Sequence, residues 1–256
     1  MSAEATMDAA PKRPAPFAPY HKWDRNFFLL LVMLIWVGIL MGFGPEIVDH
    51  VTKNEPAYPL IVHFHAVAFV GWMFLLTTQI LLVRQRRYDL HKQLGVAAMA
   101  LAAAMIVLGP ATAIVVQRAQ FGTPDSDPAF FAIQFFDIAA FAILVTAAFL
   151  RRGNSAAHKR LMLLATLEIS DAGFARWLGG PLHHIFGDSF WPYMPNFYFA
   201  NDLLIMGLGA YDLITRRRLH PAYVAGATLI GANQLLIGYL YTAPWWKDFA
   251  THLIGH

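Results

Sequence analysis

The stretch Leu60–Gln79 constrains this chain most, because it is apolar over a length that would cross a lipid bilayer. It nonetheless carries His63 and His65 near one end. Histidines inside a membrane-spanning helix are costly unless another group binds them or hydrogen-bonds to them. His65, Trp72 and Gln79 recur every seven residues and therefore share one face of the predicted helix. The pattern predicts a transmembrane helix whose polar face meets polar groups on its neighbours.

The rest of the chain has the same apolar character. Of its 256 residues, 57% are hydrophobic and 14% are charged, which is rare in a soluble domain of this length. Lipid forces the backbone to hydrogen-bond internally, so apolar runs of about 20 residues are expected to be helices. We predict an all-α integral membrane bundle of seven transmembrane helices, at residues 26–43, 58–83, 94–117, 129–150, 161–179, 194–215 and 221–241.

Proline and glycine mark the ends and bends of these spans. Gly44-Pro45 should end the first span, and Gly109-Pro110 should kink the third. The Ala/Pro-rich residues 1–22 cannot bury a core, so we predict a disordered cytoplasmic tail there and the seven-helix transmembrane domain over 23–256. The first apolar run starts too late and is too long for a usual signal peptide.

The basic residues alternate between successive loops. Fifteen of the 19 lysines and arginines precede the first span or follow the second, fourth and sixth, and three lie on the other side. The positive-inside rule then places the N-terminus in the cytoplasm and the C-terminus outside, in a bacterial inner (cytoplasmic) membrane. The basic excess therefore reflects orientation, and the expected partner is the lipid bilayer, with no nucleic acid.

Polar side chains of five spans are predicted to lie in one layer of the outer half of the membrane. Counting about 1.5 Å per residue from the outer helix ends puts most of them roughly 7–12 Å deep and Glu168 near the midplane. Arg176 is closer to the surface and could neutralise one carboxylate. Isolated polar residues in spans often only hold a bundle together. Four carboxyl groups in one layer need protons, a cation, Arg176 or water, which indicates a functional site.

Nitrogen and oxygen donors in this layer suit iron, manganese or zinc. The chain has no cysteine, which excludes thiolate metal sites and iron–sulfur clusters. His63 and His65 are two residues apart and point away from each other, so only one is expected to face the site. We predict as catalytic residues Glu168, Asp171 and Arg176, and as metal ligands His63, His65, Asp137 and Asp202.

A second pair of histidines lies toward the cytoplasmic side. His91 opens the third span in H-K-Q-L-G, and His158 precedes the fifth in H-K-R-L-M. Both could be interfacial caps beside basic residues. Alternatively, they pair across the third and fifth spans as the axial ligands of a haem, the cofactor-binding role that we predict for them.

Two resemblances bear on these patterns. The H-F-H-A motif with Trp72 and Gln79, then R-R-Y-D-L-H-K-Q-L-G, H-K-R-L-M-L-L-A-T and Arg176, resembles a family of predicted bacterial multi-pass membrane proteins of unassigned function over about residues 60–178. That resemblance implies a fold and a location, without a reaction. The chain also resembles the ascorbate-reducible di-haem transmembrane cytochromes, whose ligand pairs lie on the second and fourth and on the third and fifth helices.

The second resemblance implies His91 and His158 as the third/fifth pair, and His63 or His65 as one member of the other. The fourth span carries Asp137 and no histidine, so a second haem would lack a ligand. The resemblance therefore leaves a single haem b.

The leading functional hypothesis is metal- or haem-dependent redox chemistry on a lipid-soluble substrate. One alternative is a proton-coupled transporter, with the carboxylates and histidines as its relay. Another is a non-catalytic subunit or assembly factor that binds other membrane subunits of a larger complex. A retinal protein is excluded because the seventh predicted span has no lysine for a Schiff base. Whether the chain is an enzyme stays open.

Overall fold

The computed structural model describes residues 17–187 and 190–255, without the side chains of 190–196. These residues form helices and their connections, and no strand occurs among them. The helices are α1 (Asp24–Thr52), α2 (Leu60–Arg84), α3 (Tyr88–Gln120), the 3-10 turn η1 (Pro128–Phe130), α4 (Phe131–Leu150), α5 (Ser155–Glu168), α6 (Asp171–Phe186), α7 (Phe190–Arg216), α8 (Pro221–Thr242) and α9 (Pro244–Leu253).

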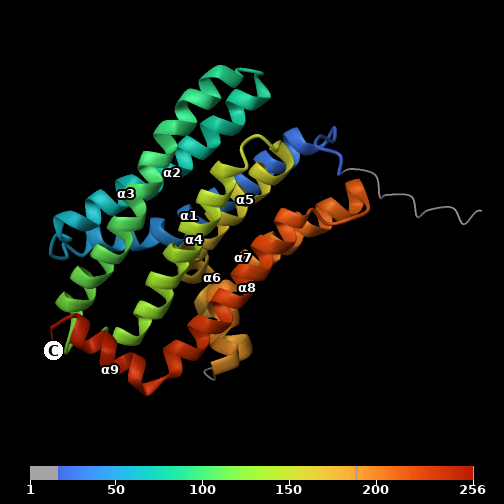
Figure 1. The fold of residues 1–256 in the computed structure, drawn as a ribbon. Helices are drawn as coiled ribbons and strands as arrows, with labels where there is room; N and C mark the ends of the chain where they lie inside the picture. The colour runs from blue at the N-terminus through green and yellow to red at the C-terminus, as the bar shows by residue number, and fades with distance from the viewer. Residues whose placement is uncertain (1–16, 188–189, 256) are drawn as a thin grey trace, which may run out of the picture.

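The helices pack as a bundle with two distinct ends (Figure 1). The turns that join α2 to α3 and α4 to α5 lie toward one end, and α9 and the chain terminus lie at the other. We call the first the basic end, because Arg84, Arg151 and Arg216 close the helices there, and the second the opposite end. Within the bundle α2 packs on α3, α4 on α5, α6 on both α1 and α7, and α8 on α4 and α5.

Five helical segments are long and apolar enough to cross a membrane: α1, α2, α3, the unit of η1 and α4, and α8. Large apolar side chains also remain exposed along them, including Leu30, Val67, Val107, Ile143 and Leu235. A soluble protein rarely leaves so much apolar surface in water. The prediction of an all-α, multi-pass membrane protein is therefore confirmed.

Two elements differ from the prediction at the opposite end. The first helix does not end at Gly44-Pro45, because α1 continues through Pro45 to Thr52. Proline removes one N–H, which transmembrane helices tolerate. The short helix α9 follows the last predicted span and lies across this end, since the Trp246 indole donates to the carbonyl of Ala129 at 3.1 Å. The Arg118 side chain adds a bond of 2.9 Å to the carbonyl of Ile254.

The predicted fifth span, 161–179, is two helices. It breaks at Ile169 and Ser170, between α5 and α6, although neither residue is a proline or a glycine. The carbonyl of Leu167 accepts from the Ser170 hydroxyl at 3.0 Å and from the Asn201 amide at 2.6 Å. Side chains thus satisfy the Leu167 carbonyl, which the interruption leaves without its helical partner.

The predicted tail, 1–22, divides into two parts. Residues 1–16 lie outside the described residues. Residues 17–22 lie on the basic end, where the carbonyl of Ala18 accepts from Arg216 at 3.0 Å and that of Pro19 from Lys159 at 3.1 Å. The ring of Phe17 covers the Arg160 guanidinium at 4.8 Å. This second part therefore contacts the bundle through Phe17, Ala18 and Pro19.

Helices α1 and α6 approach each other backbone to backbone. A Cβ atom added at Gly42 would lie 2.7 Å from the carbonyl carbon of Gly173, and one added at Gly173 would lie 3.0 Å from the carbonyl oxygen of Gly38. Small residues permit this close helix packing in membranes.

We expect Gly42→Leu to destabilise the protein by about 1–3 kcal/mol or more, because the new side chain meets rigid backbone. Thermal unfolding in detergent micelles measures the effect. Gly44→Leu is the matched control on the same helix, since a Cβ there has no neighbour within 4 Å. Equal unfolding temperatures for the two variants would contradict the close contact of α1 with α6.

Candidate functional site

Three buried carboxyl groups meet in the bundle from three consecutive helices. Asp137 of α4, Glu168 of α5 and Asp171 of α6 are each at most 5% exposed, and we call them the carboxyl cluster. The amide of Asn233 on α8 joins two of them, donating to Asp137 at 3.2 Å and to Glu168 at 2.8 Å. The prediction that separate helices bring carboxyl groups together is thus realised for these three residues.

The carboxyl groups of Asp137 and Asp171 lie close enough to interact. Two ionised carboxylates only accept hydrogen bonds, so a bond between them would need a proton on one of them. The Tyr198 hydroxyl lies 3.4 and 3.3 Å from the two carboxyl oxygens of Asp137. Neighbouring buried carboxyl groups with a phenol donor are an arrangement that can hold and release a proton.

The helix break produces this geometry. Glu168 is the last residue of α5 and Asp171 the first of α6, so both carboxyl groups stand where the backbone is irregular. Irregular backbone inside membrane proteins occurs where it is buried in protein or lines a cavity, and in transporters it marks binding sites.

The other predicted members of the outer layer have hydrogen-bond or ring partners outside the cluster. Arg176 donates to Glu46 at 2.8 Å, and both side chains are nearly half exposed. Asp202 accepts from Gln234 at 3.0 Å. His65 stacks on Phe69 with ring centres 4.1 Å apart.

His63 is exposed at the surface of α2. In the part of the chain that the structure describes, no three His, Asp or Glu side chains are grouped so that they could hold a metal ion. The set His63, His65, Asp137 and Asp202 is therefore not assembled as a metal centre, because Asp137 is bonded within the cluster while His63 faces outward.

The second predicted pair is brought together. The rings of His91 on α3 and His158 on α5 lie with their centres 6.3 Å apart and their planes at 90°. His158 donates from Nδ1 to the carbonyl of Ala148 at 2.8 Å, and Nδ1 of His91 is buried without a partner. The two imidazole rings are therefore close neighbours, one from α3 and one from α5.

The repeating polar face of α2 positions both histidines. Gln79 donates to the carbonyl of His91 at 3.1 Å. Trp72, fully buried, donates from its indole to the Thr166 hydroxyl at 3.1 Å and so ties α2 to α5. The seven-residue recurrence predicted a face that meets polar groups, and Trp72 and Gln79 meet such groups on neighbouring helices.

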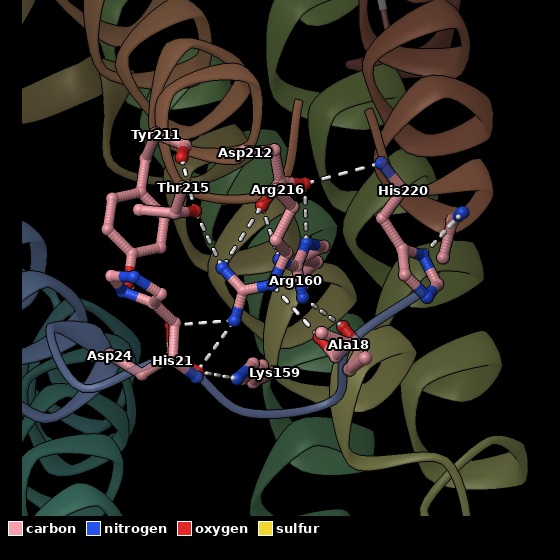
Figure 2. Close-up of polar contacts among 12 residues, drawn as sticks. Ala18, His21, Asp24, Lys159, Arg160, Tyr211, Asp212, Thr215, Arg216 and His220 are labelled. Carbon is pink, nitrogen blue, oxygen red and sulfur yellow. Dashed lines mark hydrogen bonds and ion pairs between the residues drawn. The ribbon is translucent and has the colours of Figure 1, made fainter. Parts of the chain in front are cut away.

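The start of α5 is fixed by charges (Figure 2). Arg160 binds Asp212 of α7 through both nitrogens of its fork, one at 2.7 Å, and both side chains are fully buried. Lys159 binds Asp24 at 2.6 Å, and Arg216 binds the same carboxylate at 2.8 Å. We call these five residues the ion-pair network, in which three cations surround two carboxylates.

His220 completes the network as a neutral group. Its Nδ1 accepts from the backbone N–H of Ala222 at 3.0 Å, which caps α8. Burial, reinforced by the charge of Arg160, lowers the pKa of His220 to about 4. The acceptor nitrogen therefore stays unprotonated at neutral pH, as the cap requires.

Sequence reasoning missed Asp24 and Asp212, although one signal was available. Arg160 and Asp212 have opposite charges and fall at the basic ends of two apolar runs, where an unpaired charge would be costly. It also missed the contact of Tyr198 with Asp137.

Comparisons with models of protein families, with curated proteins and with solved structures find no match for this chain. The site must therefore be interpreted from its own geometry.

We expect Asp212→Leu to destabilise the protein by about 3–5 kcal/mol, because it leaves the charge of Arg160 buried and unpaired. The double variant Arg160→Met/Asp212→Leu should recover most of that loss, since it removes both charges. Thermal or denaturant unfolding in detergent measures both.

The control for this pair is Lys53→Met, which breaks the exposed pair of Lys53 with Asp49. Exposed pairs contribute about 0–1 kcal/mol, so little change is expected. A double variant less stable than Asp212→Leu would show that the buried pair itself, rather than an uncompensated charge, carries the stability.

Proposed function

We propose that this protein is a multi-pass membrane redox protein that holds a single haem b between His91 and His158. The spacing of the two rings carries the proposal. A metal–imidazole bond is about 2 Å long, so two imidazoles on opposite sides of one metal ion have ring centres about 6 Å apart. The separation of 6.3 Å matches this value.

The hydrogen bonds of the pair also fit metal ligation. Ligating histidines almost always donate their other ring N–H to a carbonyl or carboxylate. His158 does so toward Ala148, which leaves its Nε2 for a ligand. On His91 a buried nitrogen has no partner, and an unmade bond of this kind costs about 1–3 kcal/mol unless a ligand supplies it. Only two ligands are needed, whereas a non-haem centre would need more.

The surroundings suit the size and charge of the group. Gly95 lies one helical turn after His91, and a Cβ there would meet only the Gln79 amide, at 3.6 Å. This absence of a side chain leaves room beside the ring. Lys92 directly follows His91 and is a cation for the anionic propionates of a haem, whereas Lys159 after His158 is bound to Asp24.

A bound haem would supply one-electron redox chemistry. His91 of α3 and His158 of α5 would hold the group, with His158 oriented by its bond to the Ala148 carbonyl and Lys92 beside His91 as a basic side chain. The apolar outer faces of the bundle give a lipid-soluble donor or acceptor access from the bilayer.

The proposal extends to the topology. The broken helix α5–α6 and helix α7 are taken as two further crossings, which gives seven in all. The distribution of lysine and arginine supports this count, because fifteen of them lie in segments that seven crossings put on one side. The N-terminus is then cytoplasmic, the C-terminus is periplasmic and the membrane is a bacterial inner membrane.

We expect the purified protein to show the visible absorption of a six-coordinate b-type haem, and His91→Ala or His158→Ala to lose most of it. The measurement is the absorption spectrum with haem quantified per chain. Gly95→Leu should also lower haem content while both histidines remain, because it fills the space beside His91.

The control for haem binding is His252→Ala, since His252 is exposed on α9. Free imidazole should restore the spectrum of a His158→Gly variant, which separates a lost ligand from a lost fold. Protein expressed with ample haem that has no haem absorption would overturn the proposal.

The absence of native cysteine makes the topology directly testable. Single variants Asp125→Cys and Ile185→Cys should react with an impermeant maleimide in spheroplasts. Arg152→Cys and Leu219→Cys should react only after permeabilisation. Reaction of Leu219→Cys from outside would contradict seven crossings.

A further inference from the structure

The carboxyl cluster poses a charge problem that the haem proposal does not address. Asp137, Glu168 and Asp171 are buried together, and among the described side chains none of their hydrogen bonds comes from a lysine or arginine. Three ionised carboxylates in an apolar bundle would repel one another without compensation. Protons are the simplest compensation, because a protonated carboxyl is neutral and also becomes a donor.

Asp137 and Asp171 are the members of the cluster where one such proton would be shared. Their carboxyl groups are buried and lie close enough to interact. The donors around Asp137, namely Tyr198 and Asn233, supply bonds to its oxygens but no positive charge. A single proton shared by the two carboxyl groups would provide a hydrogen bond between them and remove half of their negative charge.

Asn201 gives a second, independent indication of a hydrogen-bond donor at this place. It lies one turn after Tyr198 on α7, so both side chains share the helix face that meets the cluster. Its amide binds the Leu167 carbonyl at the break, beside Glu168. Its Oδ1 is buried without a partner in a residue that is 2% exposed. A water or a protonated carboxyl at the break would supply the hydrogen bond that this buried acceptor lacks.

The other ionisable groups described nearby do not form an ion pair with the carboxyl cluster, so they do not replace the protons. Asp202 on α7 accepts from Gln234 and would add negative charge. Arg176 on α6 is committed to Glu46 of α1. It also marks the route outward, because it lies five residues, or about 7.5 Å along the helix, beyond Asp171 and is already partly exposed. Lys159 at the basic end is further away, about 13 Å from Glu168 along α5.

We infer that Asp137 and Asp171 form a proton-binding site at the break between α5 and α6, which exchanges its proton with water at the opposite end of the bundle. On loading, hydronium gives its proton to one carboxylate and leaves as water. The new O–H donates to the partner carboxylate. On release, the proton returns to water by the same route. The site belongs to the cluster alone and does not depend on a bound haem.

Infrared spectroscopy of the full-length protein in liposomes tests this inference. At neutral pH the wild-type protein should show the C=O stretching band of a buried carboxylic acid, which shifts when H2O is replaced by D2O. Asp137→Asn and Asp171→Asn should each remove that band. Asp202→Asn is the matched control from the same region and should keep it.

Three further results decide the matter. Asp171→Glu retains a carboxyl group, so its spectrum should contain the carboxylic acid band at a shifted frequency. This result would show that Asp171→Asn loses the band because it lacks the carboxyl group and not because it is misfolded. His158→Ala should keep the band, which separates this site from the haem site. The inference is overturned if the wild-type protein lacks the band at neutral pH, or shows it only when sodium and potassium are removed. It is also overturned if the band survives in both Asp137→Asn and Asp171→Asn.

Discussion

The ion pair between Arg160 and Asp212 determines where both candidate sites lie. Its two side chains are fully buried, so the cost of removing them from water is offset mainly by their mutual charge and their paired hydrogen bonds, together with the bonds to the Ala156 carbonyl and from the His220 backbone N–H. The pair fixes α5 against α7. Helix α5 carries His158 two residues before Arg160 and Glu168 at its other end. A shift of α5 would therefore move the imidazole and the carboxyl group together.

The positions of the helices were predictable because lipid permits few alternatives to a helix. Their interruptions were not. The sequence 161–179 has no proline or glycine at Ile169 and Ser170, and the break depends on the Asn201 amide, which comes from a distant part of the chain. Pro45 gave the reverse error, because it predicted an end where α1 continues.

That second error explains the misplacement of Arg176. A first helix that ended at Gly44 would offer Arg176 no partner. A carboxylate of the cluster was therefore the expected partner. The continued helix instead presents Glu46 at 2.8 Å. Helical rise brought Asp137, Glu168 and Asp171 to similar levels in the prediction, because rise per residue depends only on helix geometry. It could not predict that His63 faces outward, because a level along a helix says nothing about the direction in which a side chain points. The spacing of His91 and His158 likewise depends on how α3 and α5 pack, which no local pattern contains.

Helix α5 also sets the distance between the two sites. Glu168 lies ten residues after His158 on a continuous helix, which is about 15 Å. In a medium with an effective dielectric constant near 20, two unit charges at this distance interact by about 1 kcal/mol. An electron gained at one end would then favour proton uptake at the other by several-fold, with no movement of the helix. Thermodynamic linkage between the two charges would thus be a property of a single rigid segment.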